Sequence, residues 1–157
     1  MTRLYGRALG GQRMVDAAPH GHWSTTTMIS ALRVDGSTAD MVVDSATDGA
    51  VFLTYVEKIL APTLKEKDLV IMDNLAAHKM SAIVAAIEAT GAEVRFLPPY
   101  SPDLNPIEKM WSKIKAYLRK EKARTQEALW QAIGAALKTI SASDAFNWFK
   151  SCGYTQS

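Results

Sequence analysis

The stretch of residues 69–97 constrains the fold more than any other part of the sequence. It begins with LVIM (69–72), a short continuous apolar run that is typical of a central strand covered on both faces. The alanine-rich residues 76–90 predict a helix that ends at Gly91, and AEVRFL (92–97) predicts the next strand. Because a helix joins these two strands, we expect them to be parallel neighbours in the sheet of an α/β fold.

The rest of the chain predicts further strands and helices around this unit. Residues 23–34 are rich in β-branched side chains and end at Asp35-Gly36, so we expect a strand, a turn and a second strand through about Val43. Helical spacing of apolar residues predicts helices over 47–60, 105–122, about 126–138 and 144–151. The apolar stripe of the helix over 105–122 consists of Ile107, Met110, Trp111, Ile114 and Leu118.

Composition bounds the class of protein. The 157 residues, 48% hydrophobic and 22% charged, make one domain's worth of an ordinary globular protein rather than a disordered one. We expect a single domain over 1–157, with the sheet core and its helices in 1–122 and the C-terminal helices in 123–157. The single cysteine, Cys152, excludes an internal disulfide framework, and no apolar run is long enough to span a bilayer. These features predict a cytoplasmic protein without a membrane partner.

One predicted helix is strongly basic. Residues 109–124 carry seven basic residues and one acidic residue, a net charge of +6, whereas the whole chain has +2, which leaves −4 for the remainder. A basic helix on a mildly acidic domain suits a contact with the phosphate backbone of DNA. The alternative is a solvated face, which is common for lone basic helices. The candidate DNA-binding residues are Lys109, Lys113, Lys115, Arg119 and Lys120.

Two carboxylates follow neighbouring predicted strands. Asp73 comes directly after LVIM, at the strand end where ligands gather in open α/β sheets; as an alternative, it caps the next helix. Glu108 comes after the next strand and three residues after Asn105, so its alternative role is in a helix capping box. Because both leave the same edge of the sheet, the two carboxylates can converge. Converging carboxylates suit Mg²⁺, and a metal pair activates the attacking oxygen in phosphodiester chemistry.

Three segments carry a resemblance to a known family. The pattern D-N-x-x-x-H at 73–78, the run LPPYSPDLNPIE at 97–108 and the basic helix with Trp111 resemble DDE transposases of the mariner superfamily. The pattern is most similar to the bacterial insertion-sequence branch called "IS six-thirty", whose D-34-E spacing matches the 34 residues between Asp73 and Glu108. The resemblance runs over nearly the whole chain.

The resemblance implies a fold and a reaction. It implies a ribonuclease-H-like (integrase and transposase) mixed sheet flanked by helices, and metal-dependent cleavage and transfer of DNA strands with Mg²⁺ or Mn²⁺ in a two-metal site. It makes Asp73 the second acid and Glu108 the third acid, with transposon ends and target DNA as partners. It also implies a bacterial, nucleoid-associated location.

The chain departs from the family pattern at the first acid. In the family this aspartate lies on the first, central strand, just upstream of a segment like TRLYGRA, which here occupies residues 2–8. We therefore expect a sheet that lacks this strand and its acid. Asp44, which ends MVVD, does not replace it, because in the family's strand order it lies three steps from LVIM, roughly 14 Å at ~4.8 Å per step.

This departure leaves several readings open for the chain alone. We expect that residues 1–157 neither cleave nor join DNA by themselves, and that they are poorly soluble or depend on a partner. That partner is a second copy of the chain or an upstream transposase half. The alternatives to a working enzyme are an inactive remnant, a fragment that binds DNA or a partner, and the second half of a frameshifted product.

Several other polar residues are weaker candidates. Asn74 and His78 lie where they can support a metal site or a phosphate, or can simply shape the local turn. His20 and His22 have ligand-like spacing, but no third ligand lies near them in the sequence. A loop cluster near the N-terminus, which either contacts DNA or is solvated, consists of Arg3, Arg7 and Arg13.

Overall fold

The computed structural model describes Gly10 and residues 25–154. The predictions for Arg3, Arg7, Arg13, His20 and His22 therefore lie outside the described residues. Within the described part, no helix combines the length and the apolar character that crossing a bilayer requires.

An antiparallel hairpin follows the predicted turn. It consists of β1 (Thr27–Leu32) and β2 (Thr38–Val43), with Ile29 opposite Met41. Gly36 in the turn has a φ of +88°, a left-handed conformation that glycine adopts without strain. The predicted strand, turn and second strand are confirmed.

The hairpin separates two hydrophobic clusters because successive side chains of a strand point to opposite faces. One face contributes Ile29, Ala31, Ala39 and Met41 to the first cluster, and the other contributes Met28, Leu32 and Val42 to the second. We call them the α1 cluster, built on Phe52, Tyr55, Val56, Leu60, Ile83 and Ile87, and the α3 cluster, built on Met110, Ile114, Leu118, Ala132, Ile133 and Ala136.

The predicted helix at 47–60 is present. Its first part is α1 (Gly49–Tyr55), which continues as a π-helical turn (Val56–Leu60) and a 3-10 turn (Ala61–Thr63). Tyr55 is 1% exposed, and its hydroxyl donates a hydrogen bond of 2.9 Å to the backbone carbonyl of Ala39 in β2. This bond satisfies the buried hydroxyl and holds the helix against the hairpin.

The helix predicted over 76–90 is interrupted, so the prediction of one continuous helix was wrong. The structure has a 3-10 turn (Ala76–Lys79) and then α2 (Ser81–Glu88), separated by Met80 with an extended ψ of 131°. The Met80 side chain lies directly over Gly49, where an added Cβ would meet its sulfur at 2.4 Å. This packing between distant segments favours the break over a continuous helix.

Two short strands form the predicted parallel pair. They are β3 (Leu69–Met72) and β4 (Glu93–Phe96), with Met72 opposite Phe96. In the part of the chain that the structure describes, this pair and the hairpin are separate two-stranded sheets, whereas we expected one mixed sheet.

One face of β3 is less covered than the sequence predicted. Val70 and Met72 pack against the α1 cluster, but Leu69 on the other face is 54% exposed and Ile71 is only half-buried. The prediction of a strand covered on both faces was therefore wrong, because the described helices cover one face only.

The C-terminal part contains three helices: α3 (Ile107–Glu121), α4 (Gln126–Leu137) and α5 (Ala142–Ser151). The predicted stripe of α3 is confirmed, with its centre in the α3 cluster and Ile107 and Trp111 half-buried at its margin. The predicted Asn105 cap was wrong, because α3 begins after Pro106 without a side-chain capping bond. A 3-10 turn (Pro102–Leu104) just before it sets the chain direction instead.

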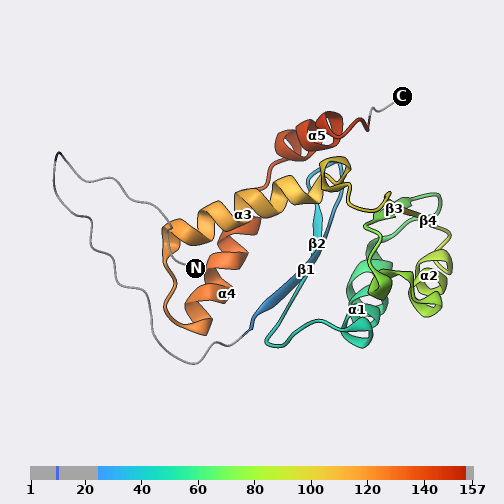
Figure 1. Cartoon of the computed structure of the whole chain (residues 1–157), viewed down its shortest axis with the longest axis horizontal. Helices are drawn as coiled ribbons and strands as arrows, with labels where there is room; N and C mark the ends of the chain where they lie inside the picture. Colours follow the sequence, from blue (N-terminus) through green and yellow to red (C-terminus); the bar gives the residue numbers. More distant parts are fainter. Residues whose placement is uncertain (1–9, 11–24, 155–157) are drawn as a thin grey trace.

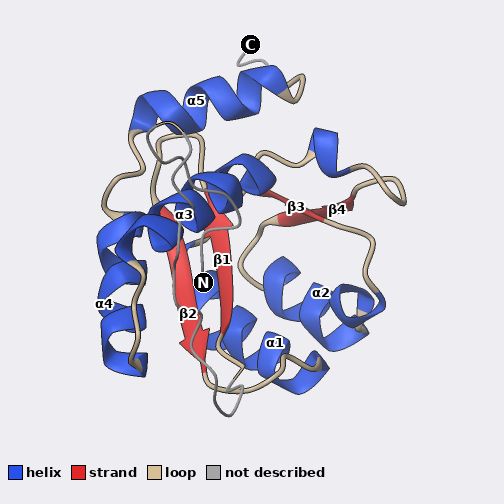
Figure 2. Ribbon diagram, turned by 60° about the vertical axis from the view of Figure 1, so that its left-hand side comes forward, coloured by secondary structure: helices blue, strands red, loops and turns tan. Residues whose placement is uncertain are grey.

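Figure 1 shows how these parts are arranged. The β1–β2 hairpin lies in the middle, α3 and α4 lie on one side of it, and α1, α2, β3 and β4 lie on the other. The view in Figure 2 shows the two sheets as separate pairs of strands and α5 alongside the N-terminal half of α3. The fold is a mixed α/β architecture in which the hairpin is the middle layer.

Candidate functional site

The segment after β3 brings three polar side chains together. His78, in the 3-10 turn, stacks on Phe52 of α1, with ring centroids 4.2 Å apart and planes at 28°. Its Nδ1 lies 2.5 Å from Oδ1 of Asp73. The separation is that of an ion pair, but neither atom makes an aligned hydrogen bond, and Oδ1 of Asn74 is also buried without a partner in the described structure. Oδ1 of Asn74 is thus without any partner among the described residues, whereas Asp73 and His78 face each other without an aligned hydrogen bond.

These oxygen atoms fit a positively charged group. A buried polar atom without a hydrogen bond is unfavourable; Oδ1 of Asn74 makes none, and Oδ1 of Asp73 faces only the His78 ring. Carboxylate and amide oxygens are the ligands that Mg²⁺ and Mn²⁺ prefer. Among the described residues, however, no three His, Cys, Asp or Glu side chains are grouped so that they could hold a metal ion. Asp73 and Asn74 thus offer oxygen atoms of the kind that a cation site uses, and their role as ligands stays a prediction.

Glu108 lies in the first turn of α3 and is exposed. Its side chain makes no hydrogen bond within the described structure, so its alternative role in a capping box is not seen. The backbone N–H of Leu97 donates to the carbonyl of Met72 at 2.8 Å. Because β3 and β4 are parallel, Asp73 and the segment that leads to Glu108 leave the same edge of the pair. The convergence of the two carboxylates stays a prediction.

Hydrogen bonds from the end of α5 and from the segment after it fix the start of α3. The Tyr154 hydroxyl donates to the Leu104 carbonyl at 2.9 Å, and Nζ of Lys109 donates to the Ser151 hydroxyl at 2.7 Å. These two bonds lie on either side of Glu108 in the sequence. The segment after α5 and the last turn of α5 thus fix the position of the turn that carries this acid.

Lys113 forms a second tie between α3 and α5. Its Nζ donates to the Thr139 carbonyl at 2.6 Å and forms an ion pair with Oδ2 of Asp144 at 2.7 Å. The ammonium of Lys113 and the hydroxyl of Ser141 lower the pKa of Asp144 to about 2. Two of the five candidate DNA-binding residues, Lys109 and Lys113, are therefore engaged within the protein.

This ion pair makes the stability of the protein depend on pH. Because the folded pKa of Asp144 is below that of an unfolded aspartate, its contribution is complete above about pH 4 and is lost as the pH falls toward 2. We expect Asp144→Asn to lower the free energy of unfolding at pH 7 by about 0.5–1 kcal/mol, a value discounted for partial exposure. Urea unfolding at pH 7 and at pH 2.5 measures this, and the loss should shrink at the lower pH.

Asp103 supplies the matched control for that measurement, because it is an exposed aspartate without an ion pair in the described structure. We expect Asp103→Asn to change the stability little at either pH. Equal losses for the two variants would contradict a specific role of the Lys113–Asp144 pair.

The other basic residues of α3 form an open surface. Lys115, Arg119 and Lys120 are exposed and make no hydrogen bond or ion pair with the described residues. Separations of seven and four residues return to the same side of a helix, so Glu108, Lys115 and Arg119 share one face. We call Lys115, Arg119 and Lys120 the basic face. Lys115 and Arg119 can bind phosphate groups along a line that leads toward Glu108, and Lys120, roughly 100° further around the helix, lies beside that line.

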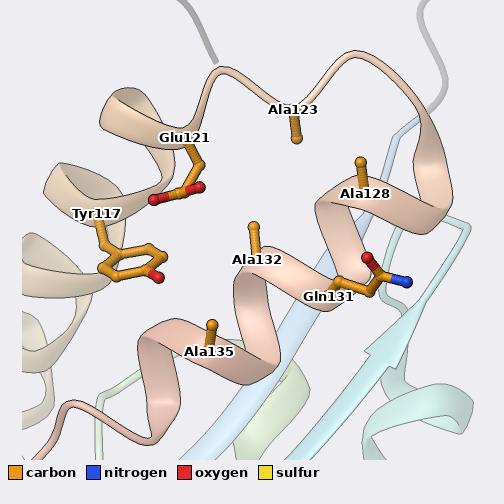
Figure 3. Close-up of a pocket in the computed structure, with 7 residues that line it drawn as sticks. All are labelled: Tyr117, Glu121, Ala123, Ala128, Gln131, Ala132 and Ala135. Atoms are coloured by element: carbon orange, nitrogen blue, oxygen red, sulfur yellow. The ribbon is translucent and has the colours of Figure 1, made fainter.

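A pocket between α3 and α4 is not part of this site. Its volume is about 280 Å³, and Figure 3 shows the side chains around it: Tyr117 and Glu121 from α3, Ala123 from the connection between the helices, and Ala128, Gln131, Ala132 and Ala135 from α4. Tyr117 and Glu121 belong to the C-terminal half of α3, whereas Glu108 lies in its first turn. Glu121 is the only charged side chain that lines this pocket, so it offers no converging groups for catalysis.

Comparison with known protein families shows the family to which this chain belongs. Residues 1–130 match the family described as DDE superfamily endonuclease, which is well over half of the chain. The chain belongs to the DDE superfamily endonuclease family. No curated protein matches it at the significance that we required.

The fold of this DDE endonuclease chain is similar to a solved structure, described as the crystal structure of the Mos1 strand transfer complex. The TM-score is 0.72 at 15% sequence identity, and the match covers 96% of this chain and 46% of the Mos1 chain. The likeness establishes the ribonuclease-H-like fold. The chain spans a little under half the length of the protein that it matches.

Some contacts of the candidate site could not be predicted from the sequence of this DDE endonuclease chain. The contact between His78 and Phe52 joins two elements that lie far apart in the chain, and the Lys113–Asp144 pair joins two different helices. Lys113 belongs to a run of basic residues that all look alike in the sequence. Its spacing from Lys109 places both on one side of α3, but only the structure identifies α5 as their neighbour.

Proposed function

We propose that this chain forms the catalytic domain of a DDE transposase. It takes part in metal-dependent cleavage and transfer of DNA strands in insertion-sequence transposition. The observation that carries the proposal is the pair of acceptor atoms without a hydrogen bond at Asp73 and Asn74, at the end of β3, in a chain of the DDE endonuclease family. The motifs at 73–78 and 97–108 favour the mariner superfamily and its "IS six-thirty" branch.

In this proposal Asp73 and Glu108 hold the metal ions, Mg²⁺ or Mn²⁺. When bound, the ions activate the attacking oxygen and stabilise the leaving oxygen of the phosphodiester. Asn74 adds an oxygen beside Asp73, and the stacking of His78 on Phe52 fixes the ring next to the Asp73 carboxylate. The basic face binds the DNA backbone on the approach to Glu108.

We also propose that the two separate sheets belong to one larger sheet. An additional strand would pair with the edge of β3 that β4 leaves free and would carry the first acid of the triad. The half-covered face of β3, with Leu69 54% exposed, supports an incomplete sheet. The strand comes from a further segment of the protein or from an upstream transposase half.

Supplying this strand tests the proposal. We expect an added segment with an apolar strand and an aspartate, in cis or co-expressed, to increase the soluble yield and to produce Mg²⁺-dependent cleavage of transposon-end DNA. The same segment with asparagine in place of its aspartate should restore solubility without cleavage. Cleavage and joining by the 157-residue chain alone, abolished by Asp73→Ala, would contradict the need for a further acid.

A second function class is a DNA-binding fragment or inactive remnant without catalysis. The absence of a group of three metal-binding side chains among the described residues favours it. The same experiment separates the two classes. A chain that binds DNA through the basic face, but never cleaves it when the added strand is present, belongs to the second class.

A further inference from the structure

Tyr100 combines full exposure with an unfavourable backbone conformation. It is 101% exposed, and its φ is +57°, in the left-handed region that bulky residues avoid. Two other described residues that are not glycine have positive φ, but each donates a backbone hydrogen bond: Lys67 to Gly91 at 2.9 Å, and Lys122 to Leu118 at the end of α3 at 3.2 Å. Tyr100 makes no hydrogen bond or ring contact within the described structure. No contact among the residues that the structure describes explains its position.

The segment around Tyr100 is stiff. Pro99 and Pro102 lie on either side of it, and proline fixes φ in the backbone. The Ser101 hydroxyl donates to the Pro99 carbonyl at 3.3 Å, and the Leu104 carbonyl accepts the bond from Tyr154. The ring is therefore presented to solvent from a braced turn. An apolar ring held in water in this way is unfavourable unless a partner covers it.

The position of this turn identifies the partner. It lies between the end of β4 and the start of α3, on the edge of the β3–β4 pair where Asp73 also leaves. The turn leads into α3, and the basic face begins about two helical turns further along that helix, at Lys115. An aromatic ring stacks on any exposed base, without regard to sequence.

We propose that Tyr100 stacks on an unpaired nucleobase of the DNA strand end that Asp73 and Glu108 hold. This inference rests on the proposed function. It adds a substrate-positioning contact, and it requires a single-stranded base next to the acids rather than a fully paired duplex. The phenol hydroxyl has no role in it, since the ring supplies the contact.

The test compares two DNA probes bound by the protein with its sheet completed by the added strand. One is a duplex with a short single-stranded end that carries 2-aminopurine, and the other is the blunt duplex of the same paired sequence. Tyr100→Asn removes the ring and keeps a residue that tolerates the left-handed conformation, whereas Tyr100→Phe keeps the ring. Phe146→Asn, on the exposed face of α5, is the control for loss of any exposed aromatic ring.

We expect Tyr100→Asn to lose about tenfold in affinity for the single-stranded end, the order that one stacked base contributes, and nothing for the blunt duplex. Quenching of 2-aminopurine should also be lost, while Tyr100→Phe and Phe146→Asn behave as wild type. Equal affinities of wild type and Tyr100→Asn for each probe, or the same loss on both probes, would overturn this inference and leave the proposed function standing. A wild-type chain that binds neither probe overturns both.

Discussion

Replacement of Lys115, Arg119 and Lys120 together by alanine is expected to lower the affinity for DNA by about two orders of magnitude near 0.1 M salt. Each cation that neutralises a phosphate releases counterions, so the loss of three contacts should reduce the slope of log affinity against log salt by about 2.7. The three side chains are exposed and make no bond within the described structure, so the fold should be unaffected. Fluorescence anisotropy over a salt series measures both quantities.

Lys113 provides the matched control on the same helix. Its ammonium is engaged by Asp144 and Thr139, so Lys113→Ala should leave the salt slope unchanged and lower the stability instead. A triple variant with an unchanged slope would show that the basic face does not meet DNA. A slope reduced as much by Lys113→Ala as by a single change on the basic face would contradict our division of the helix.

Loss of either acid is expected to remove the metal-dependent reaction. In the protein with its sheet completed, Asp73→Asn or Glu108→Gln should each slow cleavage by about 10³-fold or more, because a metal ion contributes several kcal/mol of transition-state stabilisation. Both changes keep the size of the side chain and remove its charge. Single-turnover cleavage over an Mn²⁺ titration measures the loss.

Asp103→Asn separates a metal role from a general effect of charge. Asp103 is an exposed acid in the 3-10 turn just before α3, and it has no hydrogen bond or ion pair within the described structure. We expect this variant to cleave at the wild-type rate. Comparable losses for Asp103→Asn and Glu108→Gln would remove the reason to assign Glu108 to the metal site.

The parts of the fold that were predictable depend on local signals. The turn at Asp35-Gly36 and the β-branched runs beside it predicted the hairpin, and the helix between LVIM and EVRF predicted a parallel pair. The spacing of the α3 stripe identified the residues that pack in the α3 cluster. In each case the periodicity of the element and its end signals lie within a short stretch of chain.

The parts that were missed depend on contacts between distant segments. The break at Met80 follows from packing over Gly49, which lies in another helix. The separation of the strands into two sheets depends on what lies beside β1 and β3, and no local pattern encodes this. Asn105 is a good capping residue in isolation, but the turn at 102–104 places the helix start one residue later.

The candidate site was also predictable only in part: its two acids were predicted from the sequence, and the contacts around them were not. Asp73 and Glu108 were predicted from their places after strands and from the family motif; the structure has Asp73 directly after β3 and Glu108 in the first turn of α3, and their role stays a prediction. The support around them was not predictable, because His78 is held by Phe52 of α1 and the turn before Glu108 by Tyr154. A residue that acts through tertiary packing leaves no pattern in its own segment.

The distance between the Asp73 and Glu108 carboxylates tests the central claim most directly. A crystal structure of the protein grown with Mn²⁺, with anomalous scattering to locate the ion, measures it. We predict carboxylates roughly 4–8 Å apart, the span that bridges a metal pair, with an anomalous peak between them. Side chains that face opposite sides of the β3–β4 pair, with no peak between them, would reduce Glu108 to a residue at a helix end and would contradict the nuclease assignment.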